Sequence, residues 1–162
     1  MNKFVALLCV LPMLLLAACA PKSAENKAAA DVVESAEMEE QDVPYSIAKR
    51  YFVKNTVGEF NINRIADKET FEQYFGMAAV MGRDGLPTTI DFEQEFVIPV
   101  VLPETGYELS IVPVSLRNNG RGELLFNCRV DTLRELSYTI RPLLLTIVSK
   151  SFDTDNVVVE ID

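Results

Sequence analysis

Residues 118–122 read Asn118-Asn119-Gly120-Arg121-Gly122, and this stretch decides how the chain folds. An Asn-Gly pair supplies the positive φ angles that a tight hairpin turn requires. After the turn, alternate residues place an apolar face on one side of a strand: Leu124, Phe126, Cys128 and Val130. We therefore expect two antiparallel strands joined here, with Cys128 as an inert residue of the core, because apolar surroundings suppress thiolate formation.

The strand before the turn changes its pattern along the way. Apolar residues occupy positions 107, 109 and 111 and then positions 112, 114 and 116, with Pro113 at the change. An extra residue in a β-bulge produces such a change of parity, so we expect a bulge near Pro113. The preceding apolar run, from Phe96 to Leu102, contains Pro99, which favours an edge strand or a bulge.

The remaining apolar runs predict a sheet around this hairpin. The run from Leu143 to Val148 is apolar on both faces, as is typical of a central strand that is covered on both sides. Alternating apolar residues also predict strands from Tyr45 to Val53 and from Val157 to Ile161.

A short helix is expected between the first strand and the others. Asp67 is a suitable N-cap and Gly76 a suitable stop. Phe71, Tyr74 and Phe75 share one face of this helix, which we expect to pack on a sheet. The sequence thus predicts an α+β fold: a mainly antiparallel β-sheet or small sandwich with one short helix packed on it.

The composition excludes several kinds of chemistry. The 162 residues carry a net charge of −9 and include no histidine, so no mechanism or metal site that uses an imidazole is available. The negative charge argues against nucleic acid as a partner, since phosphate binding requires clustered lysine and arginine. We expect neither a cofactor nor a metal site.

The beginning of the chain has the character of a targeting sequence. Lys3 precedes an apolar run from Phe4 to Ala18, which is shorter than the ~20 residues that span a bilayer. The run ends in Leu16-Ala17-Ala18-Cys19, which resembles the lipobox of bacterial envelope lipoproteins. The resemblance implies that Cys19 is acylated, that residues 1–18 are a signal peptide, and that several acyl chains hold the protein in a membrane. Ala20 after the cysteine implies delivery to the outer membrane, facing the periplasm.

The chain after Cys19 divides into an acidic stretch and a globular domain. Between residues 20 and 43, seven acidic residues against two basic ones give a net charge of −5, and no aromatic residue occurs. We interpret residues 19–43 as a flexible tether and residues 44–162 as a single domain.

Two acidic groups are candidate sites. Asp91, Glu93 and Glu95 would share one side of an extended segment, where paired carboxylates could act on carbohydrate or bind calcium. The alternative is a solvated acidic face, because Phe92 and Phe96 alternate with them. Asp153-Thr154-Asp155-Asn156 has part of a calcium-loop pattern but lacks its glycine and terminal glutamate, so we interpret it as a turn.

Two further short motifs resemble known signals. Asp131-Thr132-Leu133, expected at a hairpin tip, is similar to a short O-glycosylation signal of some envelope proteins. The residues from Pro103 to Tyr107, together with Arg141-Pro142 before an apolar strand, are similar to small β domains that bind envelope proteases as inhibitors or complex subunits. This resemblance implies that Thr105, Gly106 and Arg141 contact a partner; the alternative is ordinary turn and strand-start chemistry.

The sequence favours a non-enzymatic, lipid-anchored binding module that contacts another envelope protein. The alternatives are a carbohydrate-active or calcium-binding domain that uses Asp91, Glu93 and Glu95, and a structural spacer between the membrane and the rest of the envelope. The oligomeric state is left open.

Overall fold

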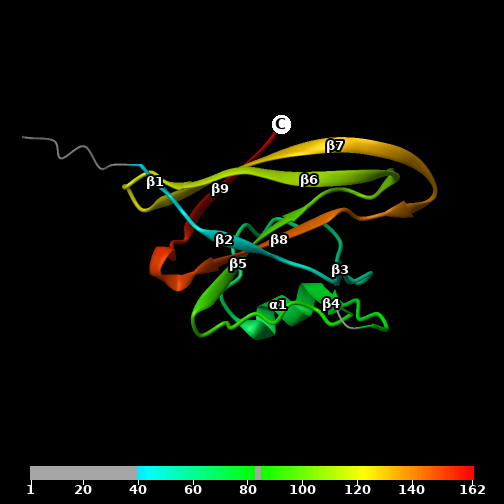
Figure 1. Cartoon of the computed structure of the whole chain (residues 1–162), viewed down its shortest axis with the longest axis horizontal. Helices are drawn as coiled ribbons and strands as arrows, with labels where there is room; N and C mark the ends of the chain where they lie inside the picture. Colours follow the sequence, from blue (N-terminus) through cyan, green and yellow to red (C-terminus); the bar gives the residue numbers. More distant parts are fainter. Residues whose placement is uncertain (1–39, 83–84) are drawn as a thin grey trace, which may run out of the picture. The chain divides into compact units, whose positions relative to one another are not determined.

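The computed structural model describes residues 40–82 and 85–162 and shows an α+β fold dominated by antiparallel strands (Figure 1). The leader, Cys19 and most of the expected tether lie outside these residues. The described elements, in chain order, are β1 (Gln41–Asp42), β2 (Tyr45–Ala48), β3 (Tyr51–Val53), α1 (Lys68–Tyr74), β4 (Phe75–Met77), β5 (Glu95–Val101), β6 (Thr105–Asn118), β7 (Glu123–Ile140), β8 (Leu143–Ser149), a 3₁₀ turn (Lys150–Phe152) and β9 (Asn156–Ile161).

One long hairpin, folded over on itself, builds both large sheets. It turns at residues 119–122, where Gly120 and Gly122 have φ angles of 69° and 79°, so the predicted hairpin is confirmed. β6 and β7 pair from this turn, and β5 and β8 continue the same pairing beyond a corner. At the corner the amide of Leu102 donates to the carbonyl of Pro142. The two halves of the ribbon thereby come to lie in different layers.

Each half of the ribbon gains further strands. The outer sheet has the order β1-β6-β7-β9, in which β9 runs parallel to β7. The middle sheet has the order β2-β8-β5, so β8 is central, as predicted. β3 and β4 form a small separate pair beside α1. Figure 1 shows the outer sheet above, the middle sheet below it, and α1 with β4 at the bottom.

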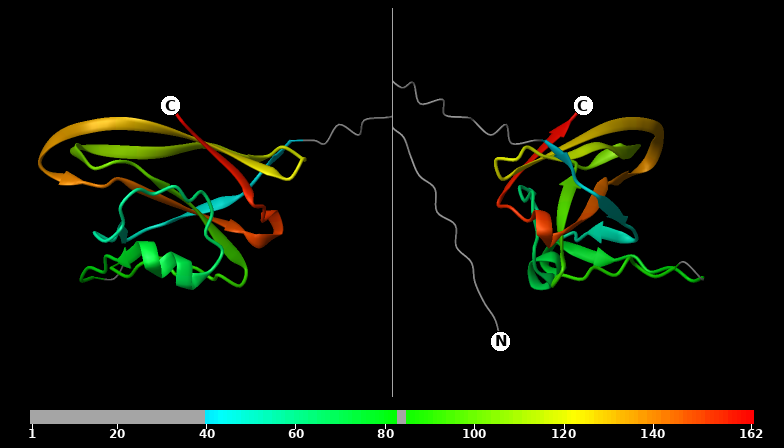
Figure 2. Two further views of the ribbon diagram at one scale, coloured as in Figure 1. Left: turned by 180° about the vertical axis from the view of Figure 1, so that it is seen from behind. Right: turned by 60° about the vertical axis from the view of Figure 1, so that its left-hand side comes forward.

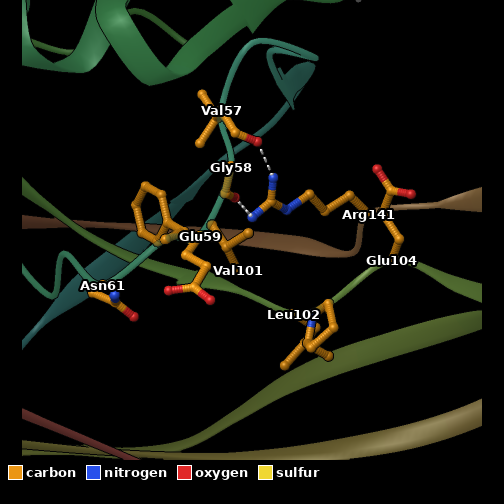
Figure 3. A pocket seen from close by; sticks show the side chains of 10 residues that line it. Val57, Gly58, Glu59, Asn61, Val101, Leu102, Glu104 and Arg141 are labelled. Carbon is orange, nitrogen blue, oxygen red and sulfur yellow. Dashed lines mark hydrogen bonds between the residues drawn. The ribbon is translucent and has the colours of Figure 1, made fainter.

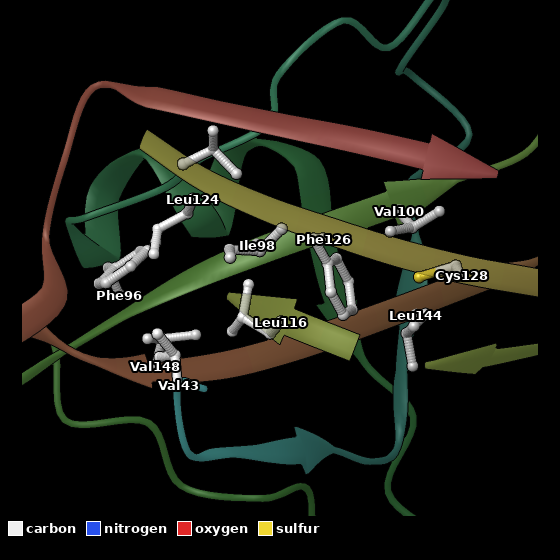
Figure 4. Close-up of a cluster of buried hydrophobic side chains, with 11 residues drawn as sticks. Val43, Phe96, Ile98, Val100, Leu116, Leu124, Phe126, Cys128, Leu144 and Val148 are labelled. Carbon is white, nitrogen blue, oxygen red and sulfur yellow. The ribbon is translucent and has the colours of Figure 1, made fainter. Parts of the chain in front are cut away.

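The first hydrophobic core lies between the outer and middle sheets (Figure 4). Because side chains alternate along a strand, each sheet turns every second side chain toward this core. The core contains Phe96, Ile98 and Val100 from β5, Leu144 and Val148 from β8, and Leu124, Phe126 and Cys128 from β7. Cys128 is fully buried, which confirms its expected place in the core. Val43 also belongs to this core and β1 pairs with β6, so the folded part includes residues that the sequence assigned to the tether.

The second core lies on the opposite face of the middle sheet. Val97, Leu145 and Ile147 point from that sheet toward Phe71 and Phe75 of the helix layer. The helix face that was expected to pack on a sheet therefore does so. β5 and β8 of the middle sheet are buried on both faces, which explains why residues 143–148 are apolar apart from Thr146.

The helix begins as expected but ends differently. The carboxylate of Asp67 accepts a hydrogen bond from the amide of Thr70 at 2.7 Å, as an N-cap does. Gly76 is not the C-terminal stop: the helix ends when Phe75 becomes extended, and Gly76 lies inside β4. A Cβ at position 76 would lie 2.4 Å from the far edge of the Phe52 ring, so this glycine lets the ring pack closely on β4 and does not serve a left-handed turn.

The proline predictions are confirmed, and one strand prediction is wrong. β5, which contains Pro99, is an edge strand of its sheet, and the pairing of β6 with β7 shifts register between Pro113 and Ser115. The single strand expected from Tyr45 to Val53 is two strands instead. Arg50 has a φ of 65°, which breaks the extended run and moves β3 into the helix layer.

Candidate functional site

The residues predicted to contact a partner meet at the corner of the folded ribbon. Thr105 opens β6 and is paired with Ile140, and Arg141 follows directly between β7 and β8. A Cβ at Gly106 would meet nothing within 4 Å, so no close approach requires a glycine there. The structure thus places Thr105, Gly106 and Arg141 at the same corner.

Arg141 is already engaged with its own chain. Its Nη1 donates to the carbonyl of Val57 at 2.7 Å and its Nη2 donates to that of Gly58 at 2.6 Å (Figure 3). Its buried Nε has no hydrogen-bond partner among the described residues. These bonds hold the loop after β3 against the corner, so Arg141 has a clear structural role.

A hollow of about 540 Å³ adjoins this arginine and contains the carboxylates of Glu59 and Glu104 (Figure 3). Its other walls are mostly backbone and small or aliphatic side chains. Arg141 keeps its charge, because its two hydrogen bonds go to neutral carbonyls, but Glu59 and Glu104 give the lining of the hollow a net charge of −1, which does not favour an anionic partner. It therefore carries no functional assignment.

The acidic triplet does not form the expected extended face. Residues 92–94 form a turn, in which the carboxylate of Asp91 accepts from the amide of Glu93 at 3.0 Å. The carboxylate of Glu95 accepts from the amide of Asp91 at 2.9 Å. The alternation of Phe92 with acidic residues is a pattern typical of a strand. Hydrogen bonds between nearby carboxylates and backbone amides form a turn here instead. Among the described residues no group of three side chains has a metal-binding arrangement.

Asp131-Thr132-Leu133 also lies elsewhere than predicted. It is inside β7, where Thr132 pairs with Leu109, and not at a hairpin tip. The prediction failed because β7 continues past this point to the corner of the ribbon. Thr132 is nevertheless exposed to solvent.

Asp153-Thr154-Asp155-Asn156 connects the 3₁₀ turn to β9, so its interpretation as a turn is confirmed. Arg64 donates to both carboxylate oxygens of Asp153, at 2.6 and 2.7 Å, and lies 3.2 Å from Asp155. These hydrogen bonds lower the pKa of Asp153 below its ordinary value. Asp153 and Asp155 thus hold the loop before β9 against Arg64.

Cys128 has no reactive character. Desolvation raises the pKa of its thiol to about 11, so almost none of it is thiolate at neutral pH.

The helix layer contains a groove of about 590 Å³ with apolar walls, which the sequence did not predict. We call it the helix-side groove. Its walls come from β3, α1, β4 and the segment 86–92, and they include Tyr51, Phe71, Phe75, Met77, Leu86 and Phe92. Apolar walls of this extent, with few polar groups, are typical of ligand and partner sites.

Ring contacts and hydrogen bonds fix the shape of the groove. The ring of Phe71 contacts those of Tyr51 and Phe92, with centroids 5.1 and 5.4 Å apart. The hydroxyl of Tyr51 donates to the carbonyl of Thr88 at 2.7 Å, which fastens the segment 86–92 to β3. The groove is thus held by the fold itself.

Exposed apolar side chains continue the groove outward. We call them the apolar rim: Met77, Val80, Met81 and Leu86. Met77 is 65% exposed, Leu86 is 78% exposed and Met81 is 98% exposed. In the right-hand view of Figure 2, the green segments on either side of residues 83–84 extend away from α1 and the sheets. Exposed apolar residues are ordinary when scattered, but a contiguous group marks an interaction surface.

Two lysines stand at the edge of the groove. The ammonium of Lys54 donates to the backbone carbonyl of Glu72, and that of Lys68 lies 3.6 Å from the carboxylate of Glu72. The lining of the groove includes these two lysines and Glu72, but the same lysines line an adjoining hollow with Glu69 and Glu72, so this edge carries no net charge. The whole chain, in contrast, has a net charge of −9.

Sequence reasoning missed this site because its walls are contributed by separate segments. One signal was available: the run Met77-Ala78-Ala79-Val80-Met81, which begins at the last residue of β4, has no polar residue. Such a run in a loop is unusual unless something covers it.

Within the described ranges no helix is long and apolar enough to cross a membrane. Comparisons with models of protein families, with characterised proteins and with solved structures found no match to this chain.

Proposed function

We propose that the protein is a lipid-anchored binding module of the cell envelope, which contacts another envelope protein through the helix-side groove and the apolar rim. The anchor is Cys19, acylated after removal of residues 1–18, and the stretch that follows is a tether. The domain faces the periplasm from the outer membrane.

The observation that carries the binding role is the continuity of groove and rim. A preformed hollow with apolar walls opens directly onto exposed Met77 and Leu86. Contact of this apolar surface with water is unfavourable by about 25 cal/mol for each Å². A partner that covers the groove and the two side chains gains this free energy on binding. A structural spacer needs no such surface.

The alternative based on acids receives no support from the geometry. Asp91 and Glu95 use their carboxylates to bind backbone amides in one turn, and Glu93 is exposed beside them. None of the three lines the helix-side groove.

The anchor is supported by the run Leu16-Ala17-Ala18-Cys19 and by the acidic composition that follows it. Its test is metabolic labelling with a fatty acid analogue and fractionation of cells that express the chain. The wild-type chain should be labelled and stay with the membrane. Cys19→Ser should lose both properties, while Cys9→Ser, a matched control in the leader, should keep them. Continued labelling of Cys19→Ser would contradict the anchor.

The binding role is tested by crosslinking in living cells of the native host, with photoreactive residues placed on both the helix layer and the outer sheet. A binding module should yield at least one discrete complex with another protein. If no position yields a complex under several growth conditions, the proposed function is wrong.

A further inference from the structure

Both methionines of the described residues belong to the apolar rim, where their side chains are open to solvent. Met77 is 65% exposed and Met81 is 98% exposed, and Met77 also lines the helix-side groove. We propose that oxidation of Met77 and Met81 to sulfoxides by a hydroperoxide is a reversible switch that releases the partner from this surface. This inference rests on the proposed function and adds its regulation.

The other side chains that oxidise readily are absent or protected. The chain contains no tryptophan and no histidine. Cys128, the one cysteine of the part that the structure describes, is fully buried, and desolvation raises the pKa of its thiol to about 11. Peroxides react with an exposed thiolate, so this residue is protected. An oxidant is therefore directed to the two methionines.

The position of the methionines separates the surface from the fold. Over residues 40–82 and 85–162, neither hydrophobic core contains a methionine. The backbone on either side of Met81 is held by a hydrogen bond from the amide of Val80 to the carbonyl of Gly85, at 2.9 Å, in which the thioether takes no part. Oxidation should therefore change the rim and leave the fold intact.

The chemical step is a transfer of oxygen with two electrons. A lone pair of the thioether sulfur attacks one oxygen of the hydroperoxide, so that the O–O bond breaks and an S–O bond forms. The methionine is oxidised to its sulfoxide, and hydrogen peroxide is reduced to water. Methionine sulfoxide reductase reverses the step: two thiols are oxidised to a disulfide, and the sulfoxide oxygen leaves as water.

The loss of binding follows from the polarity of the product. A sulfoxide is polar and chiral, whereas the thioether is apolar and adapts to an apolar partner. A partner that covers the rim would remove the water that solvates the sulfoxide oxygen. Burying a polar group without a hydrogen bond is unfavourable, so we expect oxidation to weaken binding about tenfold or more.

The first measurement tests access to the two sulfurs. The full chain is purified in detergent and treated with hydrogen peroxide, and oxidation of each residue is followed by mass spectrometry of its peptides. Met77 and Met81 should oxidise in the folded chain within about threefold of their rates in urea, whereas Cys128 should react only in urea. Thermal unfolding should be unchanged after oxidation. Strong protection of both methionines in the folded chain, or a lower Tm after oxidation, overturns the switch.

The second measurement tests release of the partner. Membranes of the native host carry the full chain with a photoreactive amino acid at Leu86, which lines the groove. They are treated with hydrogen peroxide, then with catalase, and are irradiated. The crosslinked complex of the wild type should fall about tenfold and return after methionine sulfoxide reductase and a dithiol are added. The matched control is the double variant Met77→Leu, Met81→Leu, which keeps the volume and apolar character of both side chains but cannot form a sulfoxide. It should keep the complex.

The remaining outcomes separate the switch from the binding function. Equal losses in the wild type and the leucine variant would place the effect on the partner and contradict the switch, as would an unchanged yield after complete oxidation of Met77 and Met81. If Leu86 captures no protein before oxidation, the rim has nothing to release and the switch fails. A complex captured from Val114, a 59% exposed residue of β6 outside the groove, would in that case still support the binding function. If neither position captures a protein, both proposals fail.

Discussion

Thr146 tests how the space between the two large sheets is filled. It lies in the middle of β8, its side chain is fully buried, and its hydroxyl has no hydrogen-bond partner among the residues that the structure describes. Its neighbours on the same face of the strand, Leu144 and Val148, belong to the first core. A hydroxyl left unpaired in such surroundings costs about 1–3 kcal/mol.

Thr146→Val removes that hydroxyl and keeps the shape of the side chain. The lost penalty and one additional buried methyl group, worth about 0.8 kcal/mol, both favour the folded state. We therefore expect the free energy of unfolding to rise by about 2–4 kcal/mol. For a domain of this size, each kcal/mol corresponds to a rise in Tm of roughly 3–5 °C.

The measurement is urea unfolding followed by circular dichroism, with thermal unfolding as a second reading. Val148→Thr is the matched control, because it adds a hydroxyl to a neighbouring side chain that is 1% exposed. This variant should lose about 2–4 kcal/mol, because an unpaired hydroxyl replaces a buried methyl group. If Thr146→Val is less stable than the wild type, the hydroxyl is hydrogen-bonded in solution and the reasoning is refuted.

Three further predictions concern Arg141, Cys128 and Asp153. Arg141→Met removes two hydrogen bonds from a charged group, so it should lower the free energy of unfolding by about 2 kcal/mol. It should also speed amide hydrogen exchange around Val57, and an unchanged exchange rate there would contradict the role of Arg141 in holding this loop. Cys128 should resist iodoacetamide at pH 8 in the folded protein and react in urea, since at a pKa of about 11 the thiolate is about one part in a thousand. Asp153→Asn should be less stable than the wild type by about 1 kcal/mol at pH 6, because Arg64 holds the pKa of Asp153 below its ordinary value. That stabilisation is present above the ordinary carboxyl pKa of ~4 and is lost as the pH falls through the lower pKa of Asp153 in the folded state. The difference in unfolding free energy between the variant and the wild type, measured in urea, should therefore shrink by about pH 3. A difference that persists at this pH would contradict the ion pair.

The parts of the fold that depend on neighbouring residues were predictable from the sequence. The turn at residues 119–122, the bulge near Pro113 and the cap at Asp67 all follow from local backbone chemistry. The central place of β8 was also visible, because burial on both faces leaves an apolar run that does not alternate.

The failures have physical causes as well. Nothing in the local sequence shows that Arg50 adopts a positive φ, since only tertiary contacts hold a non-glycine residue there. The turn after Asp91 has the same alternation as a strand. It is closed by hydrogen bonds that the carboxylate of Asp91 accepts from the amide of Glu93 and that its carbonyl accepts from the amides of Gln94 and Glu95. The parallel pairing of β9 with β7 and the assembly of the groove join segments far apart in the chain, and no periodicity records them.

The folded hairpin has a consequence for how the protein reaches its native state. A single turn, at residues 119–122, sets the alignment of β6 with β7 and, through the corner, that of β5 with β8. Pairing that starts at this turn can advance one residue at a time, so each step closes only a small loop. A misaligned turn would carry its error into both layers and turn Phe126 and Leu144 away from the space they share. The folding rate should therefore depend more strongly on Gly120 than on any residue of the strands.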